Sequence, residues 1–451
     1  MINSNLHHKE ELTVRSDDTA VAIVETQSKD GTKPRAKIYF HAKITANNQE
    51  FRGIHPLNSA RSHQVELPGL IYKALRQLPI AEQDDGKTIS FADCQQPLRR
   101  PDFISATRGP GMKSGLSIGL NMAKGISLAY DIPVMGVHHM QAHALTPRLV
   151  SALSATPSEV IVPDFPFRSL LVSGGHTLLV NGKTLVDFEQ EITTLDMVAG
   201  DCIDKMARYI LPEALLNEHD KDTNYGAALE SFAFPNGEAD YNYTPPKNRE
   251  DLLRAHSTTY GWAVSPPLQG SGRKEFSFTS LTSVARQIVL NGSARLGETR
   301  NQPRNIPIES DERRELARQV QRVAFEHIAD RVHIVLKSDS SIRGPLNSRL
   351  APQTAKKLES PFQLVVSGGV ASNKFLRHVL DTFLKSRGVN VKLISPPVSL
   401  CTDNAIMIAW AGIEMWEAGW RSKMDCTMEN RWPLAGEDNG LIGIGGWQKE
   451  T

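Results

Sequence analysis

The sequence predicts an α/β fold with two lobes, each built on a mixed or parallel sheet. Apolar strands alternate with helical stretches along most of the chain, a pattern typical of sheets flanked by helices. Two of these strands, at residues 169–175 and 363–369, end in Ser-Gly-Gly and suggest a duplicated unit. A chain of 451 residues is long enough for two or three lobes with substantial cores.

The first lobe is expected at residues 12–165. Residues 19–25 (TAVAIVE) alternate like a strand, and residues 37–45 are the expected partner strand across a turn at Asp30-Gly31. The other expected elements are a helix at 61–78, a short strand at 102–106, a helix at 116–130, a strand at 132–137 and a helix that follows it.

The second lobe is expected at residues 166–402. Residues 374–386 form a helix after the second Ser-Gly-Gly strand, and residues 311–336 form a long amphipathic helix. The apolar stripe of this long helix is core and consists of Leu316, Val320, Val323, Ala324, Ile328 and Val332. The stretches 211–258 and 291–310 are rich in Asn, Arg, Glu and Pro and are expected to be surface insertions, partly disordered. The Gly-rich tail, residues 434–451, is expected to be loose.

Bulk properties narrow the function. The net charge of +1 gives no global basic field, so any contact with RNA must come from local patches. The four cysteines form no C-x-x-C pair, which argues against a disulfide framework or a zinc ribbon and fits a reducing compartment. No apolar run approaches the roughly 20 residues of a membrane span. The N-terminus lacks an apolar core segment and carries acidic Glu10 and Glu11, so it resembles neither a secretory signal nor a mitochondrial presequence.

A pair of histidines, His139 and His143, is the first candidate for chemistry. On a helix, residues four apart lie on one face, about 5–6 Å apart at Cβ, where two imidazoles can share a metal ion. The alternative is an ordinary helix face. Residue 140 is Met, where a zinc protease of the H-E-x-x-H type carries its Glu base, so a metal here does not indicate peptide hydrolysis.

Three Gly-rich turns form a second group of candidates, at residues 109–115, 173–175 and 367–369. Between a strand and a helix, such turns bring backbone N–H groups close to an anion, and the helix N-terminus adds partial positive charge. A single turn needs only a steric explanation. Three turns, two of them nearly identical, favour nucleotide or phosphate binding.

Acidic residues near expected helix starts form a third group. Asp201 and Asp204 could cap a helix or hold a ribose hydroxyl, and the cap is the slightly favoured interpretation. Asp403 precedes an apolar helix at 406–415 and is placed to cap it. Alternatively Asp403 is a third ligand beside His139 and His143, since two histidines and a carboxylate with open positions suit iron or zinc.

Taken together, the motifs resemble the TsaD family, the tRNA threonylcarbamoyladenosine synthases once called O-sialoglycoprotein endopeptidases. The motifs that carry the resemblance occur in the family's order and are Val137-His138-His139-Met140-x-x-His143, Leu171-Val172-Ser173-Gly174-Gly175-His176-Thr177, Gly200-x-x-x-Asp204-Lys205, Ser367-Gly368-Gly369-Val370-Ala371-Ser372-Asn373 and Cys401-Thr402-Asp403-Asn404-Ala405. The resemblance runs from about residue 16 to residue 412. The His-His-Met form of the first motif is that of the bacterial and mitochondrial branch.

The resemblance implies a fold, a reaction and a site. The fold is actin/Hsp70/sugar-kinase-like (ASKHA), a duplicated fold of two lobes with mixed sheets and a central nucleotide cleft, in which the helix near residues 403–420 packs back onto the first lobe. The reaction moves the threonylcarbamoyl group from threonylcarbamoyl-AMP to N6 of the adenosine 3′ of the anticodon in tRNAs that read A-starting codons. The implied metal ligands are His139, His143 and Asp403. The implied adenylate-binding residues are Leu171, Val172, Ser173, Gly174, Gly175, Asp204, Gly226 and Asn373.

The implied chemistry agrees with these residues. One divalent metal ion, iron or zinc, would act as a Lewis acid on the carbamoyl oxygen and hold the acyl group in line with the amine. AMP would leave, held by glycine turns and helix N-termini. The acyl group arrives activated, so no nucleophilic Ser or Cys is needed. No catalytic residue is assigned beyond the metal and adenylate site, and His176 and His138 remain weak candidates for a general base.

Three departures from the family pattern stand out. The family's first strand is apolar and lies in the middle of the first lobe's sheet, whereas the strand here is the polar HHKEEL. This departure predicts a mis-called start or exon boundary in the gene model, which would also explain the missing presequence. Thr282 stands where the family usually has Lys. Gly226 is the least secure adenylate position, because its context is Tyr-Gly-Ala-Ala-Leu-Glu after a stretched loop.

Two other hypotheses remain open, an ASKHA-fold small-molecule kinase or carbamoyltransferase, and a non-catalytic scaffold that binds nucleotide. A metallopeptidase is excluded because Met140 cannot supply the base. The expected tRNA surface is local, at Arg99-Arg100 or in the Arg-rich region 294–322, and ordinary solvated charge explains either equally well. A homodimer and a mitochondrial location are implied by the resemblance alone.

Overall fold

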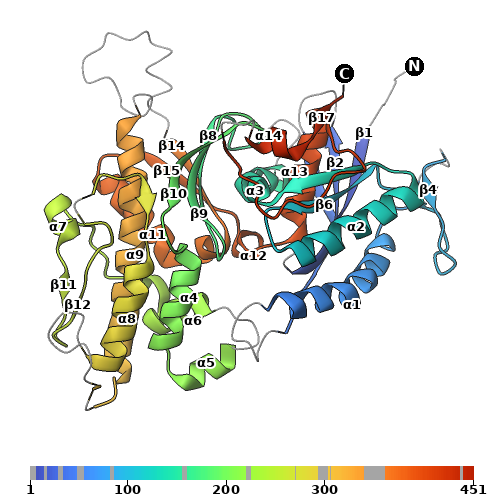
Figure 1. Cartoon of the computed structure of the whole chain (residues 1–451). Coiled ribbons are helices and arrows are strands. Elements are labelled where there is room, and N and C mark those ends of the chain that lie inside the picture. The colour runs from blue at the N-terminus through green and yellow to red at the C-terminus, as the bar shows by residue number, and fades with distance from the viewer. Residues whose placement is uncertain are drawn as a thin grey trace, which may run out of the picture. The chain divides into compact units, whose positions relative to one another are not determined.

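The chain forms two compact units in the computed structural model (Figure 1). Unit 1 comprises Met1–Phe167, Gly182–Glu189 and Pro396–Thr451, and unit 2 comprises Arg168–Asn181 and Gln190–Ser395. The structure describes residues 7–14, 18–28, 34–47, 55–81, 86–154, 160–219, 225–269, 271–292, 303–304, 306–339, 361–436 and 440–450.

A five-stranded sheet forms the centre of unit 1, with strand order β3-β2-β1-β6-β7. Its strands are β1 (His7–Val14), β2 (Thr19–Ser28), β3 (Pro34–Ile44), β6 (Phe103–Gly109) and β7 (Val134–His138). β2 is antiparallel to both β1 and β3, whereas β6 and β7 run parallel to β1. The predicted strand pair at 19–25 and 37–45 is confirmed, and the predicted turn at Asp30-Gly31 lies outside the described residues.

The polar first strand occupies the middle of this sheet, between β2 and β6. Its register places Val14 opposite Val21 of β2 and Ala106 of β6. The position expected for the family's first strand is therefore confirmed, although the strand's sequence is polar. Residues 15–17, which follow it, lie outside the described residues.

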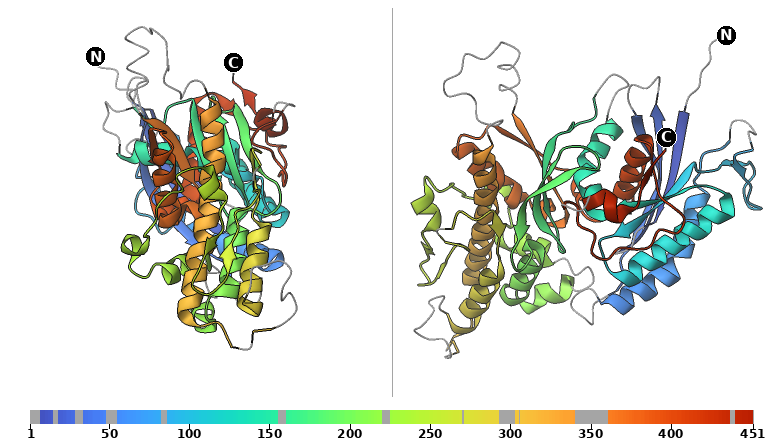
Figure 2. Two further views of the ribbon diagram at one scale, coloured as in Figure 1. Left: turned by 90° about the vertical axis from the view of Figure 1, so that its left-hand side faces the viewer. Right: turned by 45° about the horizontal axis from the view of Figure 1, so that its top comes forward.

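Helices cover both faces of the sheet in unit 1 (Figure 2). They are α1 (Pro56–Leu75) and α2 (Lys113–Tyr130) on one face and α3 (His139–Ser154) and α13 (Ala405–Glu417) on the other. Alternate residues of β6 serve the two faces, since Ile104 joins the core with α1 and α2 while Phe103 stacks on Trp416 of α13 at 4.5 Å. With helices on both faces, β6 and β7 are buried along their whole length. α1 begins at Pro56, five residues before the predicted start, because proline is favoured in the first turn of a helix.

The expectation of a loose tail is wrong for residues 440–450. This segment contains α14 (Gly440–Gly445) and β17 (Gln448–Lys449), and β17 pairs with β16 (Trp420–Arg421). Leu441 and Trp447 are buried. The glycine content of this segment predicts a loose tail, but a few large buried side chains hold it in place.

A six-stranded sheet lies mostly in unit 2, with order β13-β10-β9-β8-β14-β15. Its strands are β8 (Phe167–Val172), β9 (Thr177–Gly182), β10 (Phe188–Thr194), β13 (Glu275–Phe276), β14 (Phe362–Ser367) and β15 (Val391–Ile394). Five of these strands repeat the order of unit 1: three strands consecutive in the chain lie side by side, and two further parallel strands lie beside the first of them. The sheets are therefore duplicated. The two Ser-Gly-Gly strands do not mark this duplication, because β8 and β14 are parallel neighbours in the same sheet.

The larger helices that the structure describes in unit 2 share one core with the sheet. They are α4 (Ala199–Ile210), α6 (Tyr225–Ala233), α8 (Thr279–Asn291), α9 (Ser310–Ser338) and α11 (Lys374–Ser386). The predicted apolar stripe of α9 is confirmed, since all six of its residues are at most 1% exposed. The predicted helix 374–386 matches α11.

The stretch 211–258 is not a surface insertion in its described part. It contains α5 (Glu213–His219), α6, a short 3-10 helix η2 (Gly237–Asp240) and α7 (Arg249–Leu253). Tyr225, Leu229 and Phe234 are buried in the core. A few widely spaced apolar residues therefore hold this stretch in the core, although its composition is polar. Most of the stretch 291–310 lies outside the described residues. Among the helices that the structure describes, none is both long and apolar enough to span a membrane.

Candidate metal centre and nucleotide site

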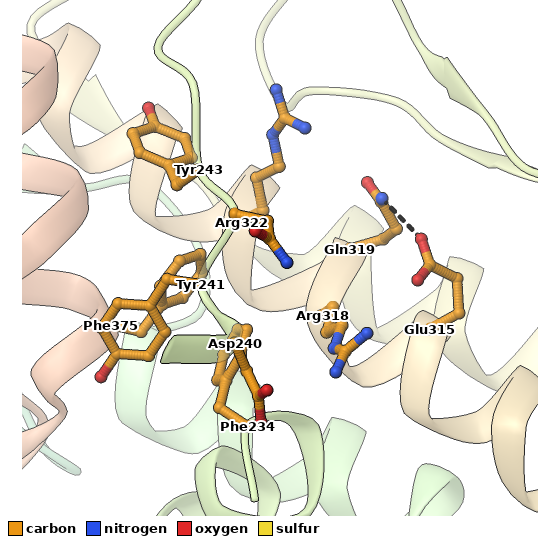
Figure 3. A pocket seen from close by; sticks show the side chains of 10 residues that line it. Phe234, Asp240, Tyr241, Tyr243, Glu315, Arg318, Gln319, Arg322 and Phe375 are labelled. Carbon is orange, nitrogen blue, oxygen red and sulfur yellow. Dashed lines mark hydrogen bonds between the residues drawn. The ribbon is translucent and has the colours of Figure 1, made fainter. Parts of the chain in front are cut away.

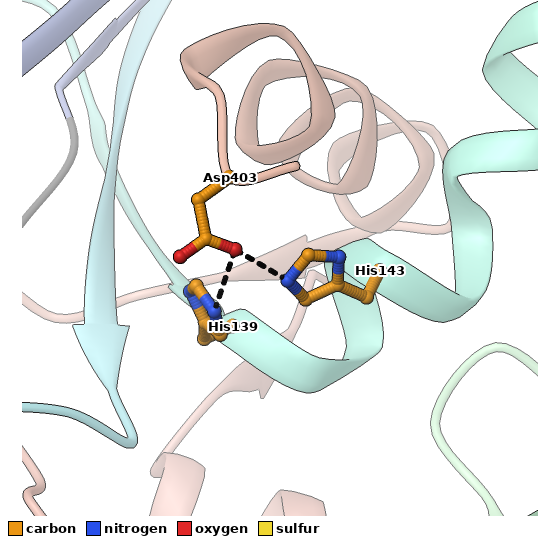
Figure 4. A group of neighbouring side chains, drawn as sticks. All are labelled: His139, His143 and Asp403. Atoms are coloured by element: carbon orange, nitrogen blue, oxygen red, sulfur yellow. Dashed lines mark hydrogen bonds and ion pairs between the residues drawn. The ribbon is translucent and has the colours of Figure 1, made fainter. Parts of the chain in front are cut away.

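His139, His143 and Asp403 lie together in unit 1 (Figure 4). The Nε2 atom of His143 is 2.8 Å from Oδ1 of Asp403, and Nε2 of His139 is 3.6 Å from the same oxygen. One potential ligand atom from each residue lies within 4.8 Å of the others. Both histidines are buried, whereas 30% of the Asp403 side chain is exposed. The structure thus brings all three predicted ligands together.

The start of α3 places the two histidines. His139 is the first residue of the helix and His143 lies one turn later, so their rings meet edge to face with centroids 4.8 Å apart. Asp403 lies in the loop between α12 (Val398–Cys401) and α13. The expected cap by Asp403 is wrong: Oδ1 of Asn404 accepts the hydrogen bond from the Met407 amide at 2.9 Å. With the cap provided by its neighbour, the Asp403 carboxylate faces the histidines.

An ion pair ties the two helices of this cluster together. Arg148 of α3 donates through Nε to both carboxylate oxygens of Glu414 on α13, at 2.9 and 3.0 Å. Its Nη1 donates to the Pro163 carbonyl at 2.6 Å. Burial raises the pKa of Glu414, and the nearby Arg148 opposes that shift. The pair fixes α3 against α13 and so fixes the histidines against Asp403.

Two hydrogen bonds hold the His138 side chain in place at the start of α3. Its Nδ1 accepts a hydrogen bond from the Gln141 amide at 3.2 Å, and its Nε2 donates to the Trp432 carbonyl at 2.9 Å. Both ring nitrogens are engaged in the neutral form with the proton on Nε2. His138 is therefore a poor candidate for a general base.

The donor set fits a first-row metal ion. Ligand atoms about 2.1 Å from a tetrahedral ion lie roughly 3.4 Å from one another, and the observed distances of 2.8 and 3.6 Å fall on either side of that value. Two imidazoles and one carboxylate suit zinc or iron and leave positions for a substrate. The donor set does not distinguish the two metals.

The first Ser-Gly-Gly turn, in unit 2, is a hairpin turn between β8 and β9, not the strand-to-helix turn expected. The Ser173 amide donates to the His176 carbonyl at 2.7 Å, and Ser173 Oγ accepts from the His176 amide at 3.0 Å. A helix N-terminus still reaches the turn, because α4 packs on it at Gly200. A Cβ at Gly200 would lie 2.5 Å from the Ser173 carbonyl oxygen. The glycine at 200 is required for this close approach.

The second Ser-Gly-Gly turn lies beside the first, since Ser367 at the end of β14 pairs with Leu171 of β8. Gly368 has φ +103°, and a Cβ there would overlap the Val172 backbone. A short 3-10 helix, η3 (Gly369–Ser372), then leads to Asn373, which caps α11 by accepting from the Leu376 amide at 2.9 Å. Leu171, Val172 and Asn373 are buried.

The third Gly-rich turn lies in unit 1 between β6 and α2, and a Cβ at Gly109 would overlap the Glu429 carbonyl. The Glu429 amide donates to the Arg108 carbonyl at 2.8 Å. The C-terminal segment therefore covers this turn, which makes it a packing site.

Asp204 and Gly226, both implied as adenylate-binding residues, are in contact. The Gly226 amide at the start of α6 donates to Asp204 Oδ1 at 2.9 Å. Burial raises the pKa of Asp204 to about 6, while the Gly226 hydrogen bond and Arg208 oppose the shift. Asp204 lies in the second turn of α4, so the favoured interpretation as a helix cap is wrong. Asp201, in the first turn, forms an ion pair with Lys205 at 2.8 Å.

Two residues of this region were not predicted. Glu230 accepts hydrogen bonds from the Lys374 and Phe375 amides at 2.7 and 3.2 Å, and burial raises its pKa. Gln321 accepts from Asn373 Nδ2 at 3.1 Å and donates to the Leu229 carbonyl at 3.4 Å. Glu230 belongs to the sequence stretch compared with the family, but its contact with α11 depends on packing that no local pattern shows.

The arginines expected on a tRNA surface have varied surroundings. Arg99 lies 3.5 Å from Asp102, and Arg100 donates to the Tyr130 carbonyl at 2.7 Å. Residues 294–302 lie outside the described residues. On α9, Arg318 and Arg322 line a pocket of about 190 Å³ in unit 2 (Figure 3). Its other lining residues are Phe234, Asp240, Tyr241, Asn242, Tyr243, Glu315, Gln319 and Phe375.

Comparison with known proteins decides the family. Residues 39–410 match the model of the TsaD family, described as tRNA N6-adenosine threonylcarbamoyltransferase. The chain belongs to the TsaD family. A TsaD relative, the mitochondrial tRNA N6-adenosine threonylcarbamoyltransferase of Schizosaccharomyces pombe, is 31% identical over 439 residues, which are 96% of this chain and 86% of that protein. The tRNA N6-adenosine threonylcarbamoyltransferase of Brucella anthropi is 30% identical over 95% of this chain and 96% of that protein.

Full-length HypF is one solved structure that is similar to this TsaD chain. The structure of full-length HypF in the phosphate- and nucleotide-bound form covers 92% of this chain and 57% of that chain, with 12% sequence identity and a TM-score of 0.41. A likeness at this level bears no further weight.

Proposed function

We propose that the chain transfers the threonylcarbamoyl group from threonylcarbamoyl-AMP to N6 of the adenosine 3′ of the anticodon in tRNAs that read A-starting codons. The observation that carries the proposal is the convergence of His139, His143 and Asp403 in a chain that matches the TsaD family over residues 39–410. A small-molecule kinase would not require such a cluster.

A divalent metal ion, iron or zinc, would be held by His139, His143 and Asp403. Bound there, it would supply Lewis acidity toward the carbamoyl oxygen. Because Nε2 of His143 must carry no proton to bind a metal, its hydrogen bond to Asp403 would be replaced by coordination of both groups to the ion. The exposed edge of Asp403 leaves the substrate side of the cluster accessible.

The adenylate would bind at the ends of β8 and β14 in unit 2. The turn at Ser173–Gly175 lies beside the N-terminus of α4, whose partial positive charge would favour the phosphate. Within the turn, the Ser173 and Gly175 amides already donate to the His176 carbonyl and to Ser173 Oγ, so the end of α4 would carry the binding. The N-terminus of α11 is a poor phosphate site, because Glu230 and Asn373 already accept from three of its first amides. The carboxylates of Asp204 and Glu230 suit ribose hydroxyls instead, as acidic residues do in dinucleotide folds.

The two units would be the two lobes of an actin/Hsp70/sugar-kinase-like fold. The first lobe would comprise residues 12–165 with the helix near 403–420, and the second residues 166–402. The strand order that is repeated in the two sheets supports this assignment. The similarity to the mitochondrial relative supports a mitochondrial location, and a homodimer is proposed by the same resemblance.

The test is an assay of the purified, metal-loaded protein with three possible outcomes. Threonylcarbamoyl-AMP and an unmodified tRNA are supplied. The tRNA is then digested, and its nucleosides are separated and identified by mass spectrometry. Modified adenosine and released AMP support the proposal. Nucleotide and Zn²⁺ binding without modified adenosine would indicate a scaffold. Phosphorylation of a small molecule from ATP, with no change in the tRNA, would indicate a kinase.

A further inference from the structure

The described C-terminal residues contact the strand that delivers the metal ligands. Residues 427–436 and 440–447, together called the C-terminal clasp here, lie against the end of β7 in unit 1. β7 ends at His138, and α3 begins with His139. Anything that fixes the end of β7 therefore acts one residue away from the first metal ligand.

Two hydrogen bonds connect the clasp to β7. Nε1 of Trp447 donates to the Gly136 carbonyl at 2.9 Å. His138 Nε2 donates to the Trp432 carbonyl at 2.9 Å, and the Trp432 ring meets the imidazole edge to face with centroids 4.7 Å apart. The clasp also holds itself together, because Nε1 of Trp432 donates to the Leu441 carbonyl at 3.2 Å. Both tryptophans and His138 are buried.

A buried arginine fastens the clasp to the neighbouring strand. Arg108 of β6 donates to the carbonyls of Thr427, Ile444 and Gly445. Its guanidinium also lies 5.1 Å from the centre of the Trp432 ring. There is no space beside it for a larger residue at 136, since a Cβ on Gly136 would lie 2.9 Å from Arg108 Cδ. Three charge-assisted hydrogen bonds in a buried position are strong and directional.

From these contacts we infer that Trp447 and His138 are positioning residues for the metal centre. His138 has two functions at once, since Nδ1 caps the first turn of α3 while Nε2 anchors that turn to the clasp. Trp447 fixes the backbone two residues earlier. Removing either anchor allows the first turn of α3 to shift, and this turn carries both imidazoles. Groups that orient metal ligands from outside the coordination sphere typically contribute tenfold to hundredfold in metal affinity.

The inference rests on the metal site of the proposed function, so the wild-type protein is measured first. Competition between the full chain and a chromophoric chelator gives its affinity for Zn²⁺. If the wild-type chain does not bind Zn²⁺, the proposed metal site itself is wrong. If it binds, the variants decide the role of the clasp.

The decisive variant is Trp447→Phe, which keeps a ring and removes only the indole donor. Its matched control is Trp262→Phe in unit 2, where a buried indole donates to Glu312 at the same distance, 2.9 Å. We expect both variants to lose some thermal stability without metal. Only Trp447→Phe should lose Zn²⁺ affinity, by about tenfold or more. Zn²⁺ affinity of Trp447→Phe within about twofold of wild type would overturn the inference.

A second variant separates the two functions of His138. In His138→Asn, the amide oxygen can still cap α3, but the side chain is too short to reach the Trp432 carbonyl. The Zn²⁺ affinity of this variant should fall by about as much as that of Trp447→Phe, about tenfold. Wild-type affinity in His138→Asn would show that the cap alone holds the ligands and would contradict a role for the clasp.

Discussion

The Nε2 atom of His143 lies 2.8 Å from Oδ1 of Asp403, although 260 positions separate the two residues in the sequence. The contact joins the first turns of α3 to the loop before α13, two helices on the same face of the five-stranded sheet. Because both imidazoles face the same oxygen of a distant carboxylate, His139 and His143 form a candidate ligand set and not an ordinary helix face.

Replacing His143 should abolish metal binding. In His143→Gln, the side chain stays polar and of similar size but can no longer offer an imidazole nitrogen, so two ligands remain. Affinity for Zn²⁺ should fall by more than about a hundredfold, beyond the usual effect of residues outside the coordination sphere. The control is His327→Gln, a buried histidine of unit 2 that accepts from the Ser277 amide. Equal Zn²⁺ affinities for the two variants would contradict the assignment.

Asp204 should make stability depend on pH. Burial raises its pKa to about 6, against 3.8 for an ordinary aspartate. Between these values the folded state binds more protons than the unfolded state, so its contribution to stability falls as pH rises from about 4 to about 6. Asp204→Asn cannot ionise. The Tm of Asp204→Asn minus the Tm of wild type should therefore be larger at about pH 7.5 than at about pH 4. A difference independent of pH would contradict the raised pKa.

Gly200→Ala should disturb the adenylate site. A methyl group at 200 would press on the Ser173 carbonyl and push the hairpin turn away from α4. Affinity for AMP, measured by calorimetry, should fall by about tenfold or more, since the turn would move away from the partial positive charge at the N-terminus of α4. Gly125→Ala on α2 is the matched control, because a Cβ there meets nothing within 4 Å and the residue is not assigned to the adenylate site. Similar AMP affinities for both variants would refute the role of this close approach.

Arg318 and Arg322 are candidates for tRNA phosphate contacts. Each also has a protein partner: Arg318 donates to the Ala233 carbonyl and Arg322 to Glu326. Replacing either by Ala should weaken tRNA binding and lower the slope of log affinity against log salt by about 1. Arg286→Ala, an exposed arginine of α8 outside the pocket, should change the slope less. Unchanged slopes for Arg318→Ala and Arg322→Ala would place the tRNA surface elsewhere.

Much of the fold could be predicted because the local patterns are strong. The stripe of α9 and the bounds of α11 follow from apolar spacing alone. The polar sequence of β1 gives no such signal, and its central place came from family resemblance. The tail and the stretch 211–258 were mispredicted because their few buried aromatic residues act through distant contacts. Composition does not record such contacts.

The site could be predicted residue by residue but not in its geometry. His139 and His143 share a helix face by spacing, whereas Asp403 reaches them only through the packing of α13 on α3. Local sequence could not show that Asn404 takes over the cap, nor that Glu230 blocks the N-terminus of α11. Both results depend on tertiary packing, which decides which polar side chain faces the N-terminus of a helix.

The most direct test of the central claim is single-turnover transfer with metal removed and restored. The full chain is stripped of metal, mixed with threonylcarbamoyl-AMP and unmodified tRNA, and assayed for modified adenosine before and after Zn²⁺ or Fe²⁺ is added. We predict no product without metal, product after one of the metals is restored to the wild-type chain, and none with His143→Gln under either condition. Equal product from stripped and restored wild-type protein, or from His143→Gln, would contradict the claim that His139, His143 and Asp403 form the catalytic metal centre.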